Sequence, residues 1–411
     1  MYKKITTILL NILLLLVYAL SFLFVRDNKT WVFGSNLGNI FGDNPKYLYL
    51  YINQLEEKEI KAIWITGNKQ IKDALANRGL PAYYLYSFKG IFYSLRAGVY
   101  IFDHISKDIC FWLSGGALKV NLFHGIPLKK IHHDNKFDMV RNPPNFYWKV
   151  KGFIRRLQNE QPEHYFLVTS QNVLPHYVSA FNSSIDKALI CGYPRNDIFF
   201  KDIEAINNES NYLIANDTEL FERVMKYKTE GYSIIVYMPT HRHSEKQLFE
   251  ILDFLELDNY LCVNKAILLV KAHPMSGIKH QLEQVEYKNI LNIEANADPY
   301  PFLIKSDALI TDYSSIYFDY LLTNKPIIFF AYDLEVYIRE SRELYYDYNK
   351  VTPGLKATTF EELLDSIDKV LNNLDQFIED RLSLRNYFFD DIDGKSSERL
   401  YQTIRSTILP K

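Results

Sequence analysis

The sequence predicts an α/β protein that contains two doubly wound domains with parallel sheets. Short apolar runs of strand character alternate with helical stretches along most of the chain, and this alternation is typical of parallel strands joined by right-handed crossovers. It stops in a polar, Asn-rich stretch near residue 205 and then starts again. We therefore expect one domain on each side of that stretch and a cleft between the two domains.

The composition is that of a folded protein with a large apolar core. The chain has 411 residues, of which 48% are hydrophobic and 23% are charged, and this length favours two domains. The net charge of -2 excludes general nucleic-acid binding through a basic surface. Only three cysteines occur and none forms a CxxC pair, so the sequence indicates a reducing compartment without a disulfide framework or zinc motif.

The N-terminal segment Ile5–Val25 is apolar and uncharged. It has roughly the 20 residues that an α-helix needs to cross a bilayer, and no small-x-small cleavage site follows it. We expect a hydrophobic membrane anchor at residues 1–28, with a segment embedded without crossing as the alternative. Its orientation stays open, because lysines precede it while Arg26 and Lys29 follow it.

After the anchor, we expect a first domain at residues 29–205, a second at 206–375 and a helical segment at 376–411 that packs back across both. The predicted strands of the first domain are Thr30–Ser35, Lys61–Gly67, Ala82–Tyr86, Val99–His104, Lys119–Gly125, Tyr165–Ser170 and Lys187–Tyr193. Those of the second are Ser233–Thr240, Ala266–Pro274, Asn289–Glu294, Ala308–Thr311 and Pro326–Tyr332. Predicted helices between them include Pro45–Lys58, Gln171–Phe181 and residues 244–257 and 359–374.

Polar motifs follow several predicted strands in both domains. In an open α/β sheet, ligands bind at the carboxyl ends of the strands. We therefore expect these motifs to build a polar ligand-binding cleft. They are His124-Gly125, Gly192–Asp197, Pro239–Arg242, Lys271–Pro274 and Thr311–Ser315.

Two histidines are candidates for acid–base chemistry. His124 follows a predicted strand, and Gly125 allows close approach of the backbone. A histidine there can act as a general base near neutral pH, and a hydrogen-bonded structural histidine is the alternative. His273 repeats the arrangement and can donate a hydrogen bond or proton to a phosphate leaving group. Lys271 beside it is either a point charge for the same phosphate or a solvated lysine.

Phosphate would have to be held without a nucleotide-binding loop, because the sequence contains no P-loop, GxGxxG or GxSxG motif. Arg195 and Arg242 follow prolines at strand ends, and arginine forks bind phosphate oxygens in bidentate fashion. Their alternative is an ion pair with a carboxylate such as Asp197. The Thr311–Ser315 motif opens a predicted helix, whose free N–H groups suit a phosphate, although its aspartate or first serine can also simply cap that helix.

Two other stretches invite a functional reading. His132, His133 and Asp134 are consecutive and cannot converge on one ion, so we expect no metal site there. Residues 145–157 mix aromatic with basic side chains, which suits an anionic membrane surface or a polyanionic acceptor. A helix with one solvated face is the alternative for that stretch.

Together, the motifs resemble the CDP-glycerol glycerophosphotransferase family, whose members make teichoic-acid and related polyol-phosphate polymers of bacterial surfaces. The resemblance begins at WVFGSNLGNIFGDNPKYLYLYI and runs through FHGIPLKKI, GYPRND, YMPTHR, KAHP and LITDYSSIYFDYLLTNKPIIFFAYDLEVY to DGKSSERL. It covers nearly everything after the anchor. The family often has Trp where this chain has Phe123 and His241, which leaves the substrate details open.

The resemblance implies two Rossmann-like domains in the glycosyltransferase-B arrangement, with the nucleotide donor held mainly by the second. It implies transfer of a polyol phosphate from a CDP-activated donor to an acceptor hydroxyl, with release of CMP, His124 as the base and His273 as its partner at the diphosphate. The donor- or phosphate-binding residues would be Arg195, Asp197, Thr240, Arg242, Lys271, Thr311, Asp312, Ser314 and Ser315. Gly125, Lys129 and Lys130 would contact the acceptor or support the local structure.

We therefore expect a transferase that uses CDP-glycerol, or CDP-ribitol, and binds no permanent cofactor, with any need for a divalent ion left open. Its acceptor would be lipid-linked or polymeric, at the cytoplasmic side of the cell membrane, for synthesis of a teichoic-acid-like, capsular or lipopolysaccharide polymer. The alternatives are a ribitol-phosphate transferase of the same family, a two-domain glycosyltransferase that uses a nucleotide sugar, and a catalytically silent membrane scaffold.

Overall fold

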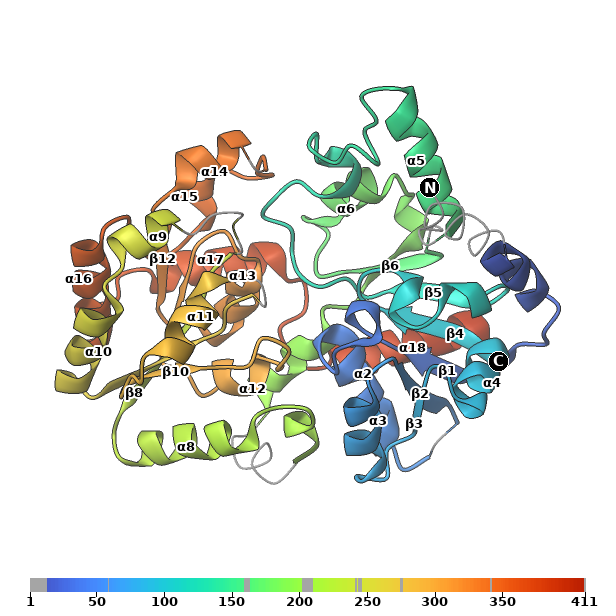
Figure 1. Ribbon diagram of the computed structural model, residues 1–411, viewed down its shortest axis with the longest axis horizontal. Coiled ribbons are helices and arrows are strands. Elements are labelled where there is room, and N and C mark those ends of the chain that lie inside the picture. The colour runs from blue at the N-terminus through green and yellow to red at the C-terminus, as the bar shows by residue number, and fades with distance from the viewer. Residues whose placement is uncertain are drawn as a thin grey trace. The chain divides into compact units, whose positions relative to one another are not determined.

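The chain forms two compact units, each built around a parallel sheet (Figure 1). The computed structural model describes residues 13–57, 59–158, 163–201, 210–240, 242, 246–273, 276–340 and 342–409. Of these, unit 1 contains the residues up to His124, His132–Ala215 and those from Asp393 onward, and unit 2 contains Gly125–Ile131 and Asn216–Ile392. The α/β class with two parallel sheets is therefore confirmed.

Unit 1 has a sheet of seven parallel strands in the order β3-β2-β1-β4-β5-β6-β7. The central strand β4 is apolar and buried along its whole length, and Trp31, Val32 and Phe33 at the end of β1 have no exposed surface, as expected for strands covered on both faces. The strands are β1 (Asp27–Phe33), β2 (Lys61–Thr66), β3 (Ala82–Tyr84), β4 (Ala97–Phe102), β5 (Leu118–Asn121), β6 (Tyr165–Val168) and β7 (Ala188–Ile190). The helices include α2 (Asp43–Gln54), α3 (Lys69–Ala76), α4 (Phe88–Arg96), α5 (Phe146–Gln158), α6 (Leu174–Phe181), α18 (Ser396–Ile408) and the 3₁₀ helices η1 (Asn36–Gly38), η2 (Ser106–Asp108), η3 (Phe111–Leu113), η4 (His132–Asp134), η5 (Ile185–Lys187), η6 (Pro194–Phe200) and η7 (Ser210–Leu213).

Unit 2 has a sheet of six parallel strands in the order β10-β9-β8-β11-β12-β13. The strands are β8 (Ser233–Met238), β9 (Ala266–Val270), β10 (Ile290–Asn292), β11 (Ala308–Thr311), β12 (Ile327–Phe330) and β13 (Leu355–Ala357). The helices include α8 (Thr218–Thr229), α9 (Lys246–Ile251), α10 (Phe254–Val263), α11 (Gly277–Gln284), α12 (Tyr300–Leu303), α13 (Ile316–Tyr320), η8 (Leu321–Thr323), α14 (Leu334–Glu340), α15 (Tyr348–Val351), α16 (Phe360–Leu371) and α17 (Ile378–Phe388). The edge strand β13 was not among the predicted strands, because it is short and its middle residue, Lys356, is charged.

Each sheet has a point at which the order of its strands reverses. In unit 1 this point lies between β1 and β4, and in unit 2 between β8 and β11. The ligand crevice of a doubly wound sheet lies outside the carboxyl ends of the two strands at the reversal. Those ends lead to Ser35 and Asp103 in unit 1, and to Thr240 and Asp312 in unit 2.

The chain passes between the units at places that the sequence did not predict. Gly125–Ile131 lies within the expected first domain but belongs to unit 2, where Lys129 forms an antiparallel bridge with Leu344 and the Tyr345 N–H donates to the Leu128 carbonyl at 2.9 Å. The expected border at residues 205 and 206 lies outside the described residues. The C-terminal segment is divided, since α17 belongs to unit 2 and α18 to unit 1.

Residues 13–21 form a helix at the start of the described chain. In the described part of the sequence, no helix is long and apolar enough to span a bilayer, and residues 1–12 of the expected anchor lie outside that part. The end of this helix is fixed on unit 1. The hydroxyl of Ser21 accepts a hydrogen bond from the Gly115 N–H at 2.9 Å, and Arg26 donates to the carbonyls of Ser94 and Leu113, both at 2.9 Å.

Candidate active site

His124 follows β5 in a tightly held turn of unit 1. Phe123 has a left-handed backbone with a φ of 51°, which is uncommon for a residue other than glycine. Asn44, fully buried at the start of α2, holds this turn by donating to the carbonyls of Leu122 at 3.1 Å and Phe123 at 2.8 Å. The turn leaves the side chain of His124 exposed at the end of the sheet.

The hydrogen bond of the His124 ring decides which nitrogen can act as a base. Nδ1 lies 3.2 Å from the main-chain carbonyl oxygen of Asp103. A carbonyl can only accept, so Nδ1 carries the proton and Nε2 of the neutral ring is free to take one. Desolvation by the surrounding protein, and next the positive charge of His104, lower the pKa of His124. The ring therefore stays neutral at physiological pH, as a general base must.

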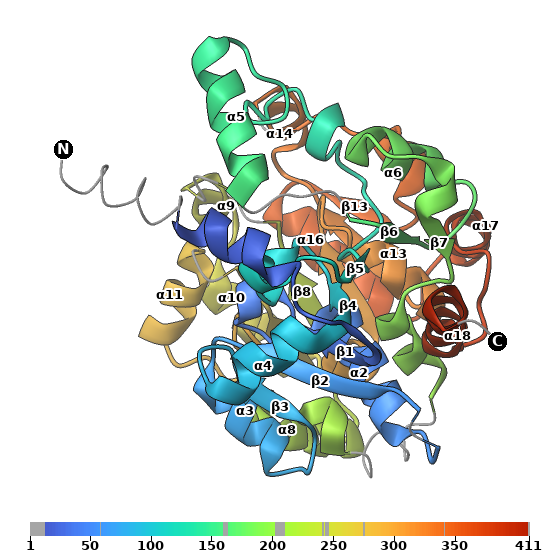
Figure 2. The ribbon, with the colours of Figure 1, turned by 90° about the vertical axis from the view of Figure 1, so that its right-hand side faces the viewer.

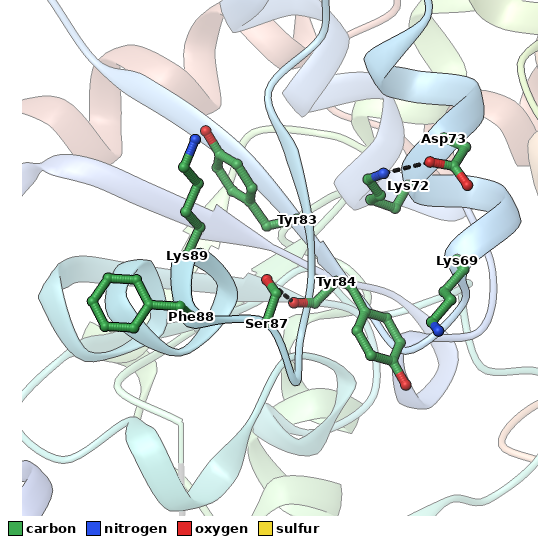
Figure 3. Close-up of a pocket in the computed structure, with 8 residues that line it drawn as sticks. All are labelled: Lys69, Lys72, Asp73, Tyr83, Tyr84, Ser87, Phe88 and Lys89. Atoms are coloured by element: carbon green, nitrogen blue, oxygen red, sulfur yellow. Dashed lines mark hydrogen bonds and ion pairs between the residues drawn. The ribbon is translucent and has the colours of Figure 1, made fainter.

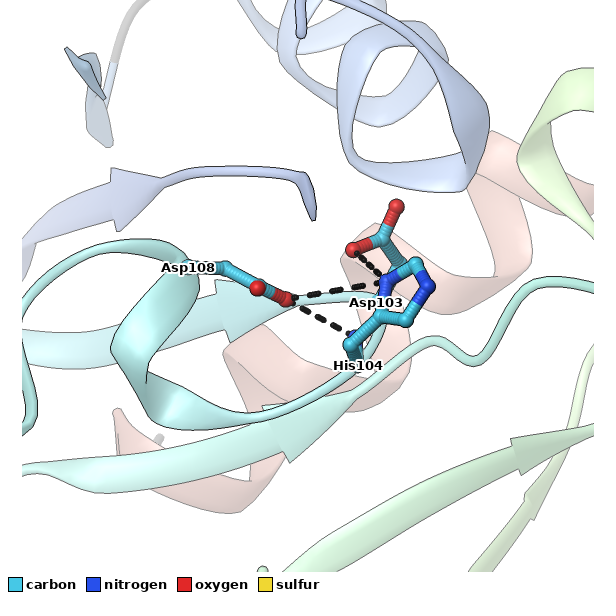
Figure 4. A group of neighbouring side chains, drawn as sticks. All are labelled: Asp103, His104 and Asp108. Atoms are coloured by element: carbon cyan, nitrogen blue, oxygen red, sulfur yellow. Dashed lines mark hydrogen bonds and ion pairs between the residues drawn. The ribbon is translucent and has the colours of Figure 1, made fainter. Parts of the chain in front are cut away.

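A buried acidic network surrounds the second histidine, His104 (Figure 4). Its Nδ1 lies 2.8 Å from a carboxylate oxygen of Asp103 and 4.0 Å from one of Asp108. Asp103 also accepts from the Ser35 hydroxyl at 2.5 Å. Burial alone would lower the pKa of His104, but the charge and the hydrogen bond of Asp103 outweigh it and raise this pKa to about 9. His104 is therefore an imidazolium at neutral pH.

Asp103, His104 and Asp108 also bring three possible metal-ligand atoms within 4.8 Å of one another. Their carboxylates already have other partners, however. Asp108 accepts from the N–H groups of Leu37 and His104, both at 2.8 Å, and of Ile105 at 3.2 Å. We therefore assign these carboxylates to fixing the loops and the histidine.

Arg195 and Asp197 have structural partners in unit 1. Arg195 forms an ion pair with a carboxylate, as the alternative expected, but the partner is Asp43, at 2.6 Å, and not Asp197. Asp197 accepts from the N–H groups of Ser396 and Ser397, both at 2.8 Å, and so holds the start of α18. Binding of a donor phosphate by either residue stays a prediction.

In unit 2, Arg242 joins the strand ends of the sheet. Its guanidinium donates to Asp312 at 2.8 Å and forms a bidentate pair with Asp333, with both bonds at 2.7 Å. Asp312 also accepts from the Thr240 N–H at 2.9 Å and from the N–H of Tyr313. The expected alternative, that Asp312 or Ser314 caps the following helix, is wrong, because the residue at the cap of α13 is Ser315 and its side chain makes no capping bond.

Some hydroxyl groups near this cluster are more available for binding a ligand than its charged groups, which are already paired with one another. Ser314 and Ser315 are half-buried at the start of α13, and the Thr240 hydroxyl is buried without a hydrogen-bond partner in the described structure. The Thr311 hydroxyl instead donates to the Met238 carbonyl at 2.8 Å. The serines and Thr240 can therefore offer hydrogen bonds to a phosphate, while Arg242 and Asp312 shape the surrounding loops.

Three lysines expected at the site have different surroundings. Lys129 is close to Asp312 and Arg242 in unit 2, and burial lowers its pKa to about 8 although the charge of Asp312 opposes this. Lys130 forms an ion pair with Glu343 at 3.6 Å. Lys271 donates to the Ala295 carbonyl at 2.7 Å, and burial lowers its pKa to about 8.

His273 is exposed just after β9, where the sequence placed it. Its neighbour Pro274 in the KAHP motif and His241 in the PTHR motif lie outside the described residues. Gly125 has a φ of 148°, a value that few residues with a side chain adopt.

The residues that sequence reasoning missed are Asp43, Asn44, Asp103, His104 and Asp108. For two of them the sequence did contain a signal, because the predicted strand Val99–His104 ended in Asp103 and His104, polar residues at the carboxyl end of a strand. Nothing in the sequence linked the other three to His124, because their roles depend on contacts between distant segments.

A cavity of about 370 Å³ lies on unit 1, away from these residues. Figure 3 shows that α3, β3 and α4 supply its lining. Lys69 Nζ lies 5.3 Å from the centroid of the Tyr84 ring, and Lys89 Nζ lies 5.7 Å from that of Tyr83. Lys72 forms an ion pair with Asp73. The cavity is thus lined by cations and aromatic rings.

Two parallel Rossmann-like sheets, each with polar side chains at its point of reversal, give this protein an α/β fold of the glycosyltransferase-B-like class. The chain belongs to the CDP-glycerol:poly(glycerophosphate) glycerophosphotransferase family, which it matches over residues 16–406. It is therefore a transferase of polyol phosphate from a CDP-activated donor, and the resemblance found in the sequence is confirmed.

Several proteins of known function are similar to this chain. A teichoic acid glycerol-phosphate transferase of Staphylococcus aureus is 29% identical over 387 residues, which cover 92% of this chain and 93% of that protein. A teichoic acid poly(glycerol phosphate) polymerase of Bacillus spizizenii is 28% identical over 88% of this chain and 89% of its own. A teichoic acid poly(ribitol-phosphate) polymerase of the same species is 36% identical, but over only 58% of this chain and 36% of that protein.

The fold is similar to that of the wall teichoic acid polymerase TagF. One TagF structure matches with a TM-score of 0.70 and 24% identity over 93% of this chain and 90% of that chain. A TagF variant soaked with CDPG matches with the same TM-score and 26% identity.

Proposed function

We propose that this enzyme transfers glycerol phosphate from CDP-glycerol to a hydroxyl group of a lipid-linked or polymeric acceptor in the synthesis of a teichoic-acid-like polymer. The relatives matched over most of both chains act on glycerol phosphate by name. The observation that carries the proposed chemistry is the His124 ring, whose Nδ1–H is held by the Asp103 carbonyl so that Nε2 can accept a proton.

In the proposed reaction, His124 Nε2 takes the proton of the acceptor hydroxyl. The acceptor oxygen forms a bond to the phosphorus that carries the glycerol, and the bond from that phosphorus to the CMP oxygen breaks. No residue becomes covalently attached, so the protein acts by positioning and by stabilising charge. We assign the diphosphate to unit 2, where Ser314, Ser315 and Thr240 offer hydroxyl groups and His273 can donate to the leaving CMP.

We also propose that the enzyme works at the surface of the cell membrane, on the cytoplasmic side. The helix at residues 13–21, α4 and α5 all carry exposed apolar side chains, with Phe88 85% and Phe146 80% exposed. In both views the first helix lies between α5 and α4 (Figures 1 and 2). Basic residues accompany the apolar ones on α5, such as Lys149 and Lys151, and this combination suits a helix lying in the interface of an anionic membrane.

The experiment that tests the proposed reaction is CMP release by the purified full chain. CDP-glycerol and CDP-ribitol are supplied in parallel with a membrane-lipid extract that contains the acceptor. We expect CMP from CDP-glycerol. CMP from CDP-ribitol alone would instead support the ribitol transferase, which the 36% identical relative favours, and release of a nucleoside diphosphate from a nucleotide sugar would support the glycosyltransferase. Failure to bind any cytidine nucleotide would support the scaffold.

A further inference from the structure

The histidine beside the proposed base has no role in the reaction described so far. His104 follows β4, and its ring is stacked on that of His124 with centroids 4.1 Å apart and an angle of 9° between the planes. We infer that His104 is an anion-binding and positioning residue, a cation that holds a phosphate oxygen of a substrate next to the base His124. This inference rests on the proposed function and adds a substrate contact to it.

The position of His104 is that of a ligand-binding residue. It follows β4, one of the two strands at the reversal point of the unit 1 sheet, and the ligand crevice of such a sheet lies at this place. Its side chain is 41% exposed. The residue is therefore accessible to a substrate, whereas Asp103 beside it is buried.

Asp103 orients both histidine rings. Its carboxylate contacts Nδ1 of His104 at 2.8 Å, and its main-chain carbonyl contacts Nδ1 of His124 at 3.2 Å. The opposite nitrogen of each ring, Nε2, has no hydrogen-bond partner among the described residues. The paired rings thus present one cationic N–H donor and one basic nitrogen, and these are the two groups that an attack on a phosphate requires.

The charges around the rings explain how the pair would work. Asp103, Asp108 and Asp43 favour the charged form of His104. The charges that act on His124 are those of His104 and Arg195, which oppose its protonation, and that of Asp103, which favours it. A phosphate oxygen bound at His104 Nε2 offsets the repulsion between the positive charge of His104 and the charge that His124 gains when it takes a proton. His124 therefore accepts a proton more readily when the substrate is present, and no bond to His104 forms or breaks.

Steady-state kinetics of His104→Gln and His104→Lys test this inference. KM is measured separately for the CDP donor and for the acceptor, so the result shows which of the two supplies the phosphate. Loss of a charged hydrogen bond predicts a KM about tenfold higher for that substrate in His104→Gln, with a smaller change in the Lys variant, which keeps the positive charge. His280→Gln, at an exposed position of α11 in unit 2, is the matched control. A folded His104→Gln enzyme with both KM values unchanged would overturn the inference.

The titration of His124, followed by NMR of histidine-labelled protein, provides a second readout that needs no turnover. Removal of the neighbouring cation in His104→Gln is expected to raise the pKa of His124 toward its ordinary value near 6.5. The acid limb of kcat/KM then moves to higher pH, because His124 must be unprotonated to act. An unchanged His124 titration contradicts the inference. A wild-type enzyme that releases no CMP contradicts the proposed function instead, so the two failures can be distinguished.

Discussion

Individual carboxylates in this protein bind main-chain N–H groups at the ends of strands. Asp108 accepts three such bonds in unit 1, and Asp312 accepts from Thr240 and Tyr313 in unit 2. Each carboxylate therefore fixes a loop next to the residues that we assign to the reaction.

His124→Ala is expected to lower kcat by about 10²–10⁴-fold, which is the usual contribution of a general base. The exposed ring packs little surface that the fold needs, so the thermal unfolding temperature should stay close to that of the wild type. CMP release under saturating donor measures the effect, with His280→Ala as the control. Near-normal turnover in a folded His124→Ala enzyme would refute the assignment of the base.

Arg242→Ala is expected to destabilise unit 2. The substitution leaves Asp312 and Asp333 without their cation, and breaking a buried ion pair typically costs about 3–5 kcal/mol. Urea unfolding measures the loss, and Arg223→Ala on the exposed face of α8 is the control. The stability of Arg242→Lys should lie between that of Arg242→Ala and that of the control, because lysine keeps the charge but lacks the guanidinium fork that pairs with Asp333. Equal stability of Arg242→Ala and the control would show that the cluster does not hold the loops together.

At the scale of elements, boundaries depend on single capping residues. The stretch 244–257 was predicted as one helix, but it contains α9 and the start of α10. The second helix begins separately because Asp253 accepts from the N–H groups of Leu255 and Glu256 at 2.9 Å and 3.0 Å. The predicted strands mostly extended beyond the observed carboxyl ends. There the apolar pattern continues into the turns, as Leu122 and Phe123 after β5 show.

Asp197→Ala is expected to loosen α18, because Asp197 is the acceptor for the first N–H groups of that helix. Loss of such a cap typically costs about 0.5–2 kcal/mol. Faster hydrogen exchange in Ser396–Ile408, measured by mass spectrometry, is the expected result. Asp197→Asn should lose less of the protection of α18 against exchange, since the amide keeps one acceptor oxygen. The exposed Asp186→Ala is the control. Unchanged exchange would mean that other contacts alone hold α18.

At the scale of the whole molecule, the described structure is organised around two sheets and a chain that passes between their units more than once. Gly125–Ile131 brings Lys129 to the Arg242 cluster of unit 2, although its neighbour His124 belongs to unit 1. Residues adjacent in one motif thus serve different units.

At the same scale, the proposed membrane association can be tested with vesicles. The double variant Phe146→Asp, Phe153→Asp is expected to bind anionic phospholipid vesicles at least about tenfold more weakly, because each buried aromatic side chain contributes about 1.5–3 kcal/mol. Sedimentation with vesicles of anionic and of neutral lipid measures the change. Val263→Asp is the control, because Val263 is 83% exposed on unit 2. Equal binding by the double variant and the control would contradict the proposed membrane surface.

The sequence by itself determined the class of fold, the family and the motifs at the strand ends. These features depend on local patterns, namely apolar runs, their alternation with helices and short motifs in a fixed order, and all of these are visible along one chain. Only the tertiary structure decided which charges pair with each other, that His104 stacks on His124, and that Lys129 joins the Arg242 cluster. Such contacts join residues far apart in the chain, as Arg195 and Asp43 are, and a linear pattern contains no record of which distant side chains the sheets bring together.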